Sequence, residues 1–591
     1  MQPMLLLTAP GEGALFDAYL DEVLRSECWC LHEHRRAEAG MTAGDLAQFA
    51  LVIISRAAAQ VLAPEAVEQY LARGGRAIAI KPPRAWALIF GLTARTAETY
   101  ATVRDAYIHV PGDHPWLDGF PAPDLQVHGE MHVHEPGDAE PLASIAGQRG
   151  EVAAFPAVAV ARRGAGVGVL FAFDLAECIV THHQGRMANA SNGPDPDANR
   201  DGKFTADDLF EGMRDFSLRH VPQADVLQDL LTRVILGLAA NALPMPRLWH
   251  FPHAAPGLVL VDGDGDSMIH EDLLATLEIC GRHGARFGFF LMDAQIAALD
   301  PAEVRALREQ GHSFGPHPWV ALRPTVDEWR AEVQRIRADF RARFGFAPES
   351  LRSHSCIFPG WDESPRIFAE AGLRLDTNFM EGYRYQSGHL NGSALPARFV
   401  DREGRLIDCW EQSTVHGDDT LITDKVMLPA HSEQQCIDLS LRIIRELAHQ
   451  YHGVFHPYFH PVAVGGHGRM HTARWLDAVL AEGVRLGLPS PSPDQWLHFV
   501  QARRAAAIGD VAWDRASGAL SLRLEAPEAI AGLTVLLPRH AGAAPDRVTI
   551  DGADADLRLV PLEGLGWSAL SLDLAAGDSV AIVANYPDGA A

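Results

Sequence analysis

The chain has 591 residues, too many for one hydrophobic core, and is expected to contain several domains. Its 47% hydrophobic and 21% charged residues are typical of a globular protein and exclude a disordered chain. A formal net charge of -26 argues against a nucleic-acid partner, because binding to a phosphate backbone requires a basic surface.

Two features bear on where the protein works. Its seven cysteines show no paired CxxC spacing, which favours free thiols in a reducing compartment. The apolar run in MQPMLLLTAPGEG is too short for a signal-peptide core, and no stretch approaches the ~18 apolar residues that span a bilayer. We therefore expect a cytoplasmic protein without a membrane partner. A periplasmic or secreted location stays open for a chain whose leader has been removed.

Residues 1–240 alternate between strand-like and helix-like segments. An apolar strand ends near Thr8, the following GEGALFDAYLDEVLRSE has apolar residues at helical spacing, and PEAVEQYLARGGRAIAIKPP repeats the pattern. This alternation predicts a parallel sheet covered by helices. From Leu125 the apolar period changes to two, which predicts antiparallel strands. The four prolines of residues 241–256 then indicate a linker.

A second alternating series occupies residues 257–502. Its clearest helix is TVDEWRAEVQRIRADFRARFG, with a capping box of Thr325 and Glu328 at its start and Gly345 at its end. About seven strand-like segments separated by helices predict a (β/α) barrel. Residues 507–591 have a period of two and no helical pattern, which predicts a β-sandwich.

Acidic and histidine side chains gather at the expected carboxyl ends of the barrel strands, where such barrels carry their chemistry. The candidates are Asp262, Asp264, His312, His317, Arg352, His354, Asp376, His456 and His460. Imidazole and carboxylate together suit Zn²⁺ or another divalent first-row ion with an open position for water. Such an ion would lower the pKa of that water toward ~7. The alternative for the first aspartates is an acidic turn, with Asp266 capping the next helix.

Four of these segments, in the same order, resemble the motifs of the polysaccharide deacetylase (NodB-like) superfamily. VDGDGD is similar to its aspartate-rich first motif, and GHSFGPHPW to its second, which supplies histidine ligands. LRSHSCIFPGWDESPRIFAEAGLRLDTNF is similar to the third motif, and GVFHPYFHP to the last. The resemblance covers residues 257–502 and implies a deacetylase-like (β/α) barrel.

The sequence departs from this pattern at two places. Ala321 stands where the superfamily has a second histidine ligand. Ser353 and His354 replace the proline and tyrosine of the third motif. We infer that His354 takes the vacated ligand position.

The resemblance implies a role for each strand-end residue. The metal ligands would be Asp264, His317 and His354. Asp262 would be the general base, and His460 the acid that protonates the leaving group, with His456 as its competitor. Arg352 would orient Asp262 or stabilise developing charge. The residues expected to bind substrate are Trp361, Trp410, Asp376 and His456.

The N-terminal 240 residues resemble class I glutamine amidotransferase-like domains, including the middle domains of some β-galactosidases. The similarity lies in YLARGGRAIAIKPP and ALIFGL, and it implies a flavodoxin-like fold. An active amidotransferase needs a nucleophilic cysteine in a tight strand-to-helix turn with a histidine partner. Cys28 and Cys30 lie within or beside an early strand instead, so we expect a non-catalytic domain.

Residues 197–208, DANRDGKFTADD, match an EF-hand-type calcium loop position by position. Gly202 would make the sharp turn, and the ligands would be Asp197, Asn199, Asp201, the carbonyl of Lys203, and Asp208. Asp208 replaces the usual bidentate glutamate, which predicts a weak site. A polar loop without a metal is the alternative.

The sequence therefore predicts a multidomain α/β protein that acts on carbohydrate as a metal-dependent hydrolase, using zinc-activated water to remove an acyl group. A catalytically degenerate carbohydrate-binding or scaffold protein is the first alternative. A glycosidase-like enzyme is the second, and it would require paired carboxylates at suitable separations. The expected partner is a carbohydrate substrate, and homo-oligomerisation stays open.

Overall fold

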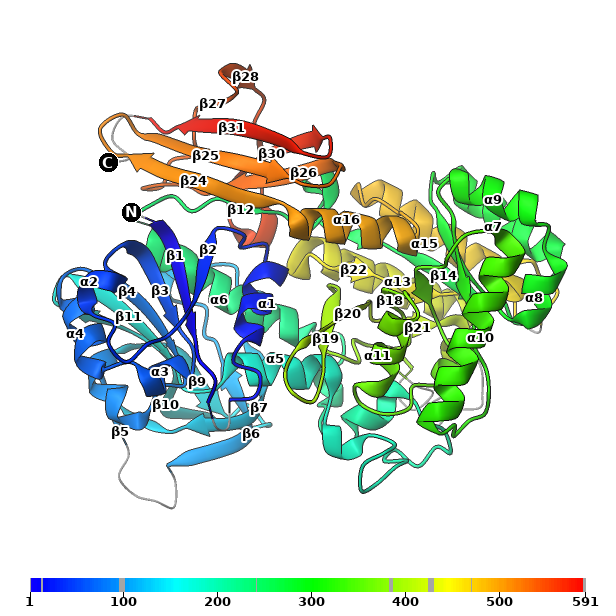
Figure 1. Cartoon of the computed structure of the whole chain (residues 1–591), viewed down its shortest axis with the longest axis horizontal. Coiled ribbons are helices and arrows are strands. Elements are labelled where there is room, and N and C mark those ends of the chain that lie inside the picture. The colour runs from blue at the N-terminus through cyan, green and yellow to red at the C-terminus, as the bar shows by residue number, and fades with distance from the viewer. Residues whose placement is uncertain are drawn as a thin grey trace.

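Figure 1 shows the computed structural model of the whole chain. It describes residues 2–11, 14–94, 101–240, 242–381, 386–422, 430–468 and 470–587. The N-terminal region (blue to cyan) lies beside the central region (green to yellow), and the C-terminal strands (orange and red) lie along the N-terminal region and reach the central one.

The N-terminal region is built on one nine-stranded sheet. Five neighbouring strands run parallel: β2 (His32–Arg36), β1 (Gln2–Thr8), β3 (Phe49–Ile54), β4 (Arg76–Ile80) and β11 (Gly166–Phe171). The first four come from the alternating segments, as predicted, whereas β11 comes from the period-two stretch after Leu125. The sheet continues in antiparallel order with β10 (Val152–Arg163), β9 (Glu140–Ala146), β6 (Thr102–His109) and β7 (Asp124–His132). The other period-two segments therefore form antiparallel strands, as predicted.

The resemblance of this region to class I glutamine amidotransferases is not supported. Four of the nine strands belong to the antiparallel half, which a doubly wound parallel sheet lacks. Cys28 follows helix α1 (Tyr19–Ser26) and is only 4% exposed. Its burial raises the pKa of the thiol, which opposes a role as a nucleophile.

Residues 242–256 are packed into the protein rather than free. Within them, β12 (Arg247–Leu248) pairs antiparallel with β26 (Ile530–Leu537) of the C-terminal region. Trp249 and Phe251 are fully buried. The prolines therefore mark a change of region. The segment itself holds the regions together, because its aromatic side chains pack into an apolar core that the regions share.

The central region has three separate sheets. β16, β15, β14, β23 and β21 form one, β17, β18, β20 and β19 form another, and β13 pairs with β22. Their bounds are β13 (Leu258–Val259), β14 (Val261–Asp264), β15 (Phe287–Leu291), β16 (Ser313–Pro316), β17 (Ser350–Leu351), β18 (Leu375–Asp376), β19 (Ala397–Val400), β20 (Leu406–Glu411), β21 (His416–Gly417), β22 (Val454–Phe455) and β23 (Pro457–Tyr458). Within the described ranges these strands do not hydrogen-bond into a closed ring, so the barrel is not confirmed.

Helices lie around these sheets. They include α7 (His270–Arg282), α9 (Pro301–Glu309), α10 (Val326–Phe344), α13 (Glu433–Glu446) and α15 (Ala473–Leu486). Helix α10 agrees with the sequence in detail: the Thr325 hydroxyl accepts from the backbone N–H of Glu328 at 3.2 Å, and Gly345 ends the helix with a φ of 83°. Its apolar stripe is buried against the neighbouring elements.

The C-terminal region consists of two antiparallel sheets, in agreement with its period-two pattern. The first contains β24 (Ala507–Asp514), β25 (Ala519–Ala526), β31 (Asp578–Asn585), β27 (Arg547–Ile550) and β28 (Ala553–Ala555). The second contains β12, β26, β30 (Trp567–Leu574) and β29 (Arg558–Val560). Helix α16 (Pro493–Ala505) leads from the central region into β24.

All seven cysteines are free, and five of them are buried, as their spacing predicts. Over the described part of the chain, no helix is both long and apolar enough to cross a membrane.

Candidate metal centre and cavity

Three segments far apart in the sequence meet where the central strands end. β14, β15 and β16 run parallel in register, so their carboxyl ends reach one edge of the sheet. Asp264 ends β14, and His317 directly follows β16. His354 begins a 3-10 turn in which Ser355 and Cys356 have φ values of 56° and 52°. Such backbone is costly for residues other than glycine, so the surrounding fold must hold His354 in place.

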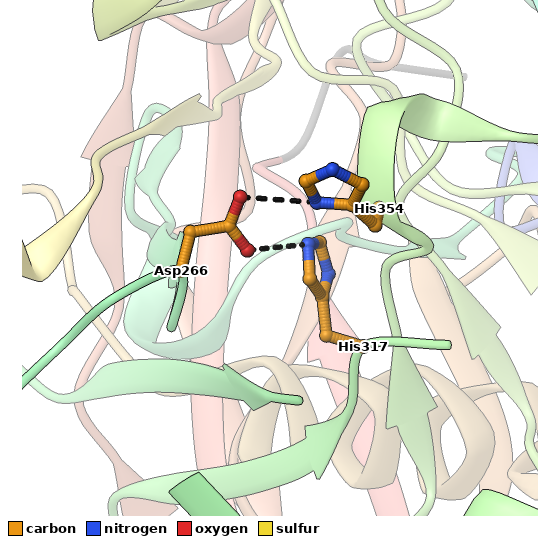
Figure 2. A group of neighbouring side chains, drawn as sticks. All are labelled: Asp266, His317 and His354. Carbon is orange, nitrogen blue, oxygen red and sulfur yellow. Dashed lines mark ion pairs between the residues drawn. The ribbon is translucent and has the colours of Figure 1, made fainter. Parts of the chain in front are cut away.

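Asp266 lies between two imidazole rings, with one carboxylate oxygen directed toward each (Figure 2). Its Oδ1 is 3.2 Å from Nε2 of His317, and its Oδ2 is 3.0 Å from Nδ1 of His354. The two ring centres are 5.3 Å apart and the rings are nearly perpendicular. Ligand atoms of these three side chains all lie within 4.8 Å of one another.

The hydrogen bonds of His317 leave a nitrogen lone pair facing this carboxylate. Nδ1 is 2.7 Å from the carbonyl oxygen of Arg352, which can only accept, so Nδ1 carries the proton. In the neutral ring the lone pair of Nε2 points toward Asp266, although Asp264 and Asp266 outweigh burial and raise the pKa of His317. Three atoms at this centre are buried without a hydrogen bond: Nε2 of His317, Oδ1 of Asp266 and Nδ1 of His354. Acceptors that face each other need a proton or a cation between them, and this set of ligands fits a divalent first-row ion.

Asp264 is the neighbouring carboxylate, on the cavity side of the same group. Its Oδ2 is 3.8 Å from Nε2 of His317, and its Oδ1 is 3.5 Å from Arg352. Burial raises the pKa of Asp264 more than His317 and Arg352 lower it. The structure thus brings His317 and His354 together, with Asp266 rather than Asp264 beside both rings.

Asp262 lies deeper, in a network without solvent contact. Its carboxylate accepts from Arg352 at 2.8 and 3.4 Å and lies 2.9 Å from Nε2 of His456. All three side chains are fully buried and none lines the cavity described below. This placement corrects two assignments: Asp262 does not reach a substrate as a general base, and His456 completes the network instead of binding substrate. Arg352 orients Asp262.

His460 also lines the cavity and is held by one carboxylate. Its Nδ1 is 2.7 Å from Oδ1 of Asp418, and its backbone N–H donates to Oδ2 at 2.8 Å. Burial lowers the pKa of His460, but Asp418 outweighs burial and raises the pKa to about 10. The imidazole is therefore protonated near neutral pH, and Nε2 is the nitrogen left to give up a proton.

A cavity of about 510 Å³ joins these groups. Its lining includes Asp264, Asp266, His354, Asn378, Asp419, Tyr458 and His460 from the central region. Pockets of this size accommodate small ligands. Asp266 and His354 of the candidate metal centre therefore border the same cavity as Asp264 and His460.

The sequence did not reveal the remaining part of the lining, which comes from the N-terminal region. Asp201, Lys203, Thr205, Ala206 and Asp207, here called the cavity wall, face the same space. The chain between them is fixed by backbone hydrogen bonds from Phe204 to Leu322 (2.9 Å) and from Phe358 to Phe204 (2.7 Å). No local pattern predicts such contacts, because they join segments more than a hundred residues apart.

The EF-hand-type loop includes this wall. Gly202 has a φ of 86°, and the carboxylate of Asp208 accepts from the backbone N–H groups of Asn199 and Thr205. Asp197 forms an ion pair with Arg323. Within the described residues, the loop aspartates do not form a group of three ligand atoms within 4.8 Å. Calcium at Asp197, Asn199, Asp201, Lys203 and Asp208 stays a prediction.

The aromatic residues assigned to substrate lie inside the protein. Trp361 is 1% exposed and donates to the carbonyl of Gly185, and Trp410 is 6% exposed beneath Arg398. Asp376 is fully buried. Their burial corrects the substrate-binding assignment, because a sugar cannot reach side chains that the core encloses.

One tryptophan that sequence reasoning missed lies at the surface beside the centre. Trp319 is 36% exposed, and its ring centre is 4.8 Å from that of His354. It belongs to the GHSFGPHPW segment, two residues after His317. An exposed aromatic ring of this kind offers an apolar face to a sugar.

No family model and no curated protein matches the chain. Among solved structures, a presumed polysaccharide deacetylase from Mycobacterium smegmatis is 16% identical, with 45% of this chain and 95% of that chain covered and a TM-score of 0.35. The peptidoglycan deacetylase PdaC from Bacillus subtilis is 11% identical, covering 43% and 95%, with a TM-score of 0.26. A β-galactosidase from Bacillus circulans is 14% identical, covering 29% and 28%, with a TM-score of 0.21. These likenesses are distant.

Proposed function

We propose that the protein is a hydrolase that removes an acyl group from a carbohydrate at a divalent-cation site formed by Asp266, His317 and His354. The observation that carries this proposal is the pair of imidazole rings on one carboxylate, with unpaired acceptor atoms facing each other beside the cavity. The deacetylase-type motifs at these positions supply the reaction class.

The chain's own residues supply proton transfer around the bound cation. A divalent cation in such a site lowers the pKa of water and polarises a carbonyl oxygen. Asp264 lines the cavity beside His317, and its raised pKa suits a group that takes up a proton. His460, held at Nδ1 by Asp418, gives a proton from Nε2 to the leaving nitrogen or oxygen.

Two surfaces are available for the sugar itself. Trp319 presents an exposed ring next to His354, and the cavity wall presents the polar side chains of Asp201 and Lys203. An apolar ring face with polar groups around it matches the alternation of C–H and O–H groups on a saccharide. The substrate class we propose is an N- or O-acylated saccharide.

The test is acetate release from a panel of acetylated oligosaccharides, together with the zinc content of the same protein samples. His317→Ala should lose activity together with the zinc bound at this centre. Asp264→Asn should keep zinc and lose about 10²- to 10⁴-fold in kcat, the usual contribution of a general base. His270→Ala removes an imidazole that is half exposed and outside the cavity, and it should change neither quantity.

One outcome would overturn the proposal, and another would remove one residue from it. A wild-type protein that binds glycans but neither zinc nor acetylated substrates productively would be a carbohydrate-binding or scaffold protein. If Asp264→Asn keeps full kcat, Asp264 is not the general base, and the proposed metal centre is unaffected by that result.

A further inference from the structure

A second buried group of ligand atoms lies where the three regions of the chain meet. Glu27 follows α1, His250 belongs to the segment after β12, and Glu563 lies between β29 and β30. Their ligand atoms all lie within 4.8 Å of one another. The three side chains, here called the junction group, are 3%, 3% and 9% exposed and lie outside the cavity of the proposed reaction.

The carboxylates of the junction group are only partly satisfied. Arg247 forms ion pairs with one oxygen of Glu27, at 3.6 Å, and with Oε1 of Glu563. Thr232 donates to the same oxygen of Glu27 at 3.1 Å. Oε2 of Glu563 is buried without any hydrogen bond, on a side chain that is 8% exposed. A buried carboxylate oxygen without a partner is costly, so this atom calls for a ligand.

His250 offers a nitrogen lone pair to the same space. The thiol of Cys28 donates to the carbonyl of Ser26, so its sulfur accepts from Nδ1–H of His250 at 3.5 Å. Nε2 therefore keeps its lone pair. Burial holds the pKa of His250 well below 6.5, so the ring is neutral, the form that binds metals.

There is space and charge for a small cation. A cavity of about 30 Å³ is lined by Glu27, His250, Glu563 and the further carboxylates Asp225 and Asp229. About 10–15 Å³ suffices for one particle of the size of water. Only two guanidinium groups, those of Arg247 and Arg233, pair with these four carboxylates. Negative groups therefore outnumber positive ones around the cavity.

We propose that the junction group binds a divalent first-row cation, such as Zn²⁺, through Glu27, His250 and Glu563. Mixed imidazole and carboxylate ligands favour this class of ion over Ca²⁺ or Mg²⁺. The ion joins the N-terminal region, the connecting segment and the C-terminal sheets, and it stabilises their docking because the ligands converge only when all three are in place. This site is independent of the proposed hydrolase.

The competing explanation is a proton shared within the group. Burial raises the pKa of Glu27 to about 8, and a protonated Glu27 would relieve part of the negative charge without any metal. Zinc stoichiometry separates the two explanations, since a proton leaves no second equivalent of metal.

The experiment uses the full chain, stripped of metal by a chelator, reloaded with Zn²⁺ and freed of excess ion by gel filtration. Wild type should retain two equivalents, His317→Ala one, and Glu563→Gln one. Adding Glu563→Gln to His317→Ala should remove the last equivalent, and Zn²⁺ affinity at the junction should fall by more than ~10-fold. Glu528→Gln, an exposed glutamate of the same region, should retain two equivalents.

His317→Ala leaves the junction group intact, so it tests the proposal even where Glu563→Gln fails to fold. Its thermal unfolding should shift to lower temperature when zinc is removed. A His317→Ala protein without zinc would overturn the junction site while leaving the hydrolase proposal standing. If instead wild type holds one equivalent that survives in His317→Ala and is lost in Glu563→Gln, the junction site stands and the hydrolase centre fails.

Discussion

Replacing Asp262 by asparagine separates a structural carboxylate from a catalytic one. Asp262 and Arg352 form a fully buried ion pair, with Nη1 2.8 Å from Oδ1, and His456 lies 2.9 Å from Oδ2. Asp262→Asn keeps the shape of the side chain but leaves the Arg352 guanidinium charged and enclosed. Arg352 cannot lose its proton, so its charge is left in the core with only the longer contact to Asp264, at 3.5 Å.

The cost follows from the burial of both partners. Removing one member of a buried ion pair typically destabilises a protein by about 3–5 kcal/mol. In a folding unit of about 150–250 residues, 1 kcal/mol lowers Tm by about 2–4 °C, so we expect a loss of roughly 6–20 °C. The double variant Asp262→Asn with Arg352→Met removes the stranded charge and should recover part of this loss.

The assay compares Tm with kcat at a temperature where every variant is folded. Asp262→Asn should lower Tm strongly and kcat weakly, whereas Asp264→Asn should lower kcat strongly and leave Tm nearly unchanged, because Asp264 faces the cavity. An Asp262→Asn protein with wild-type Tm and no activity would refute this reasoning and restore Asp262 as the general base.

Three further predictions concern the surroundings of the centre. Thr325→Ala removes the side-chain cap of α10 and should cost about 1 kcal/mol, measured by thermal unfolding. The pKa of His460 is raised from 6.5 to about 10, so its ion pair with Asp418 stabilises the fold fully below pH 6.5. That stabilisation should be lost as pH rises toward 10. The unfolding of the metal-free protein, measured against pH, should show this loss, whereas the Asp418→Asn variant should lack it. Trp319→Ala should raise KM for oligosaccharides several-fold with zinc content unchanged, and an unchanged KM would exclude stacking on this ring.

Local patterns were sufficient for elements whose signals lie within one segment. The capping box, apolar stripe and terminal glycine of α10 all describe contacts within about twenty residues, and each appears in the structure. The change of period near Leu125 agrees with the antiparallel strands β7, β9 and β10, but β6 precedes it and β11, which follows it, pairs parallel with β4. Closure of a barrel is different, because it depends on how distant strands pair, and period alone carries no information about that.

The sequence predicted which residues of the candidate site lie close together more reliably than it predicted the role of each. The histidines after β16 and β17 do come together, although these two strands belong to different sheets. Trp361 and Trp410 were assigned to sugar by residue type, but exposure decides that role and the sequence does not give it. The cavity wall, including Lys203, lies across a contact that only the folded chain creates.

The three aspartates of VDGDGD show why residue type leaves the role open. Side-chain exposure increases along the chain, from 0% for Asp262 to 8% for Asp264 and 25% for Asp266. The pKa of Asp262 is lowered because Arg352 and His456 outweigh burial, whereas burial raises that of Asp264. Gly263 permits the close approach of the next segment: a Cβ there would lie 1.9 Å from the carbonyl oxygen of Phe459, and would push away the residues after β23 that include His460. In the proposed function, depth and charged neighbours would make these three carboxylates a structural ion pair, a base and a metal ligand.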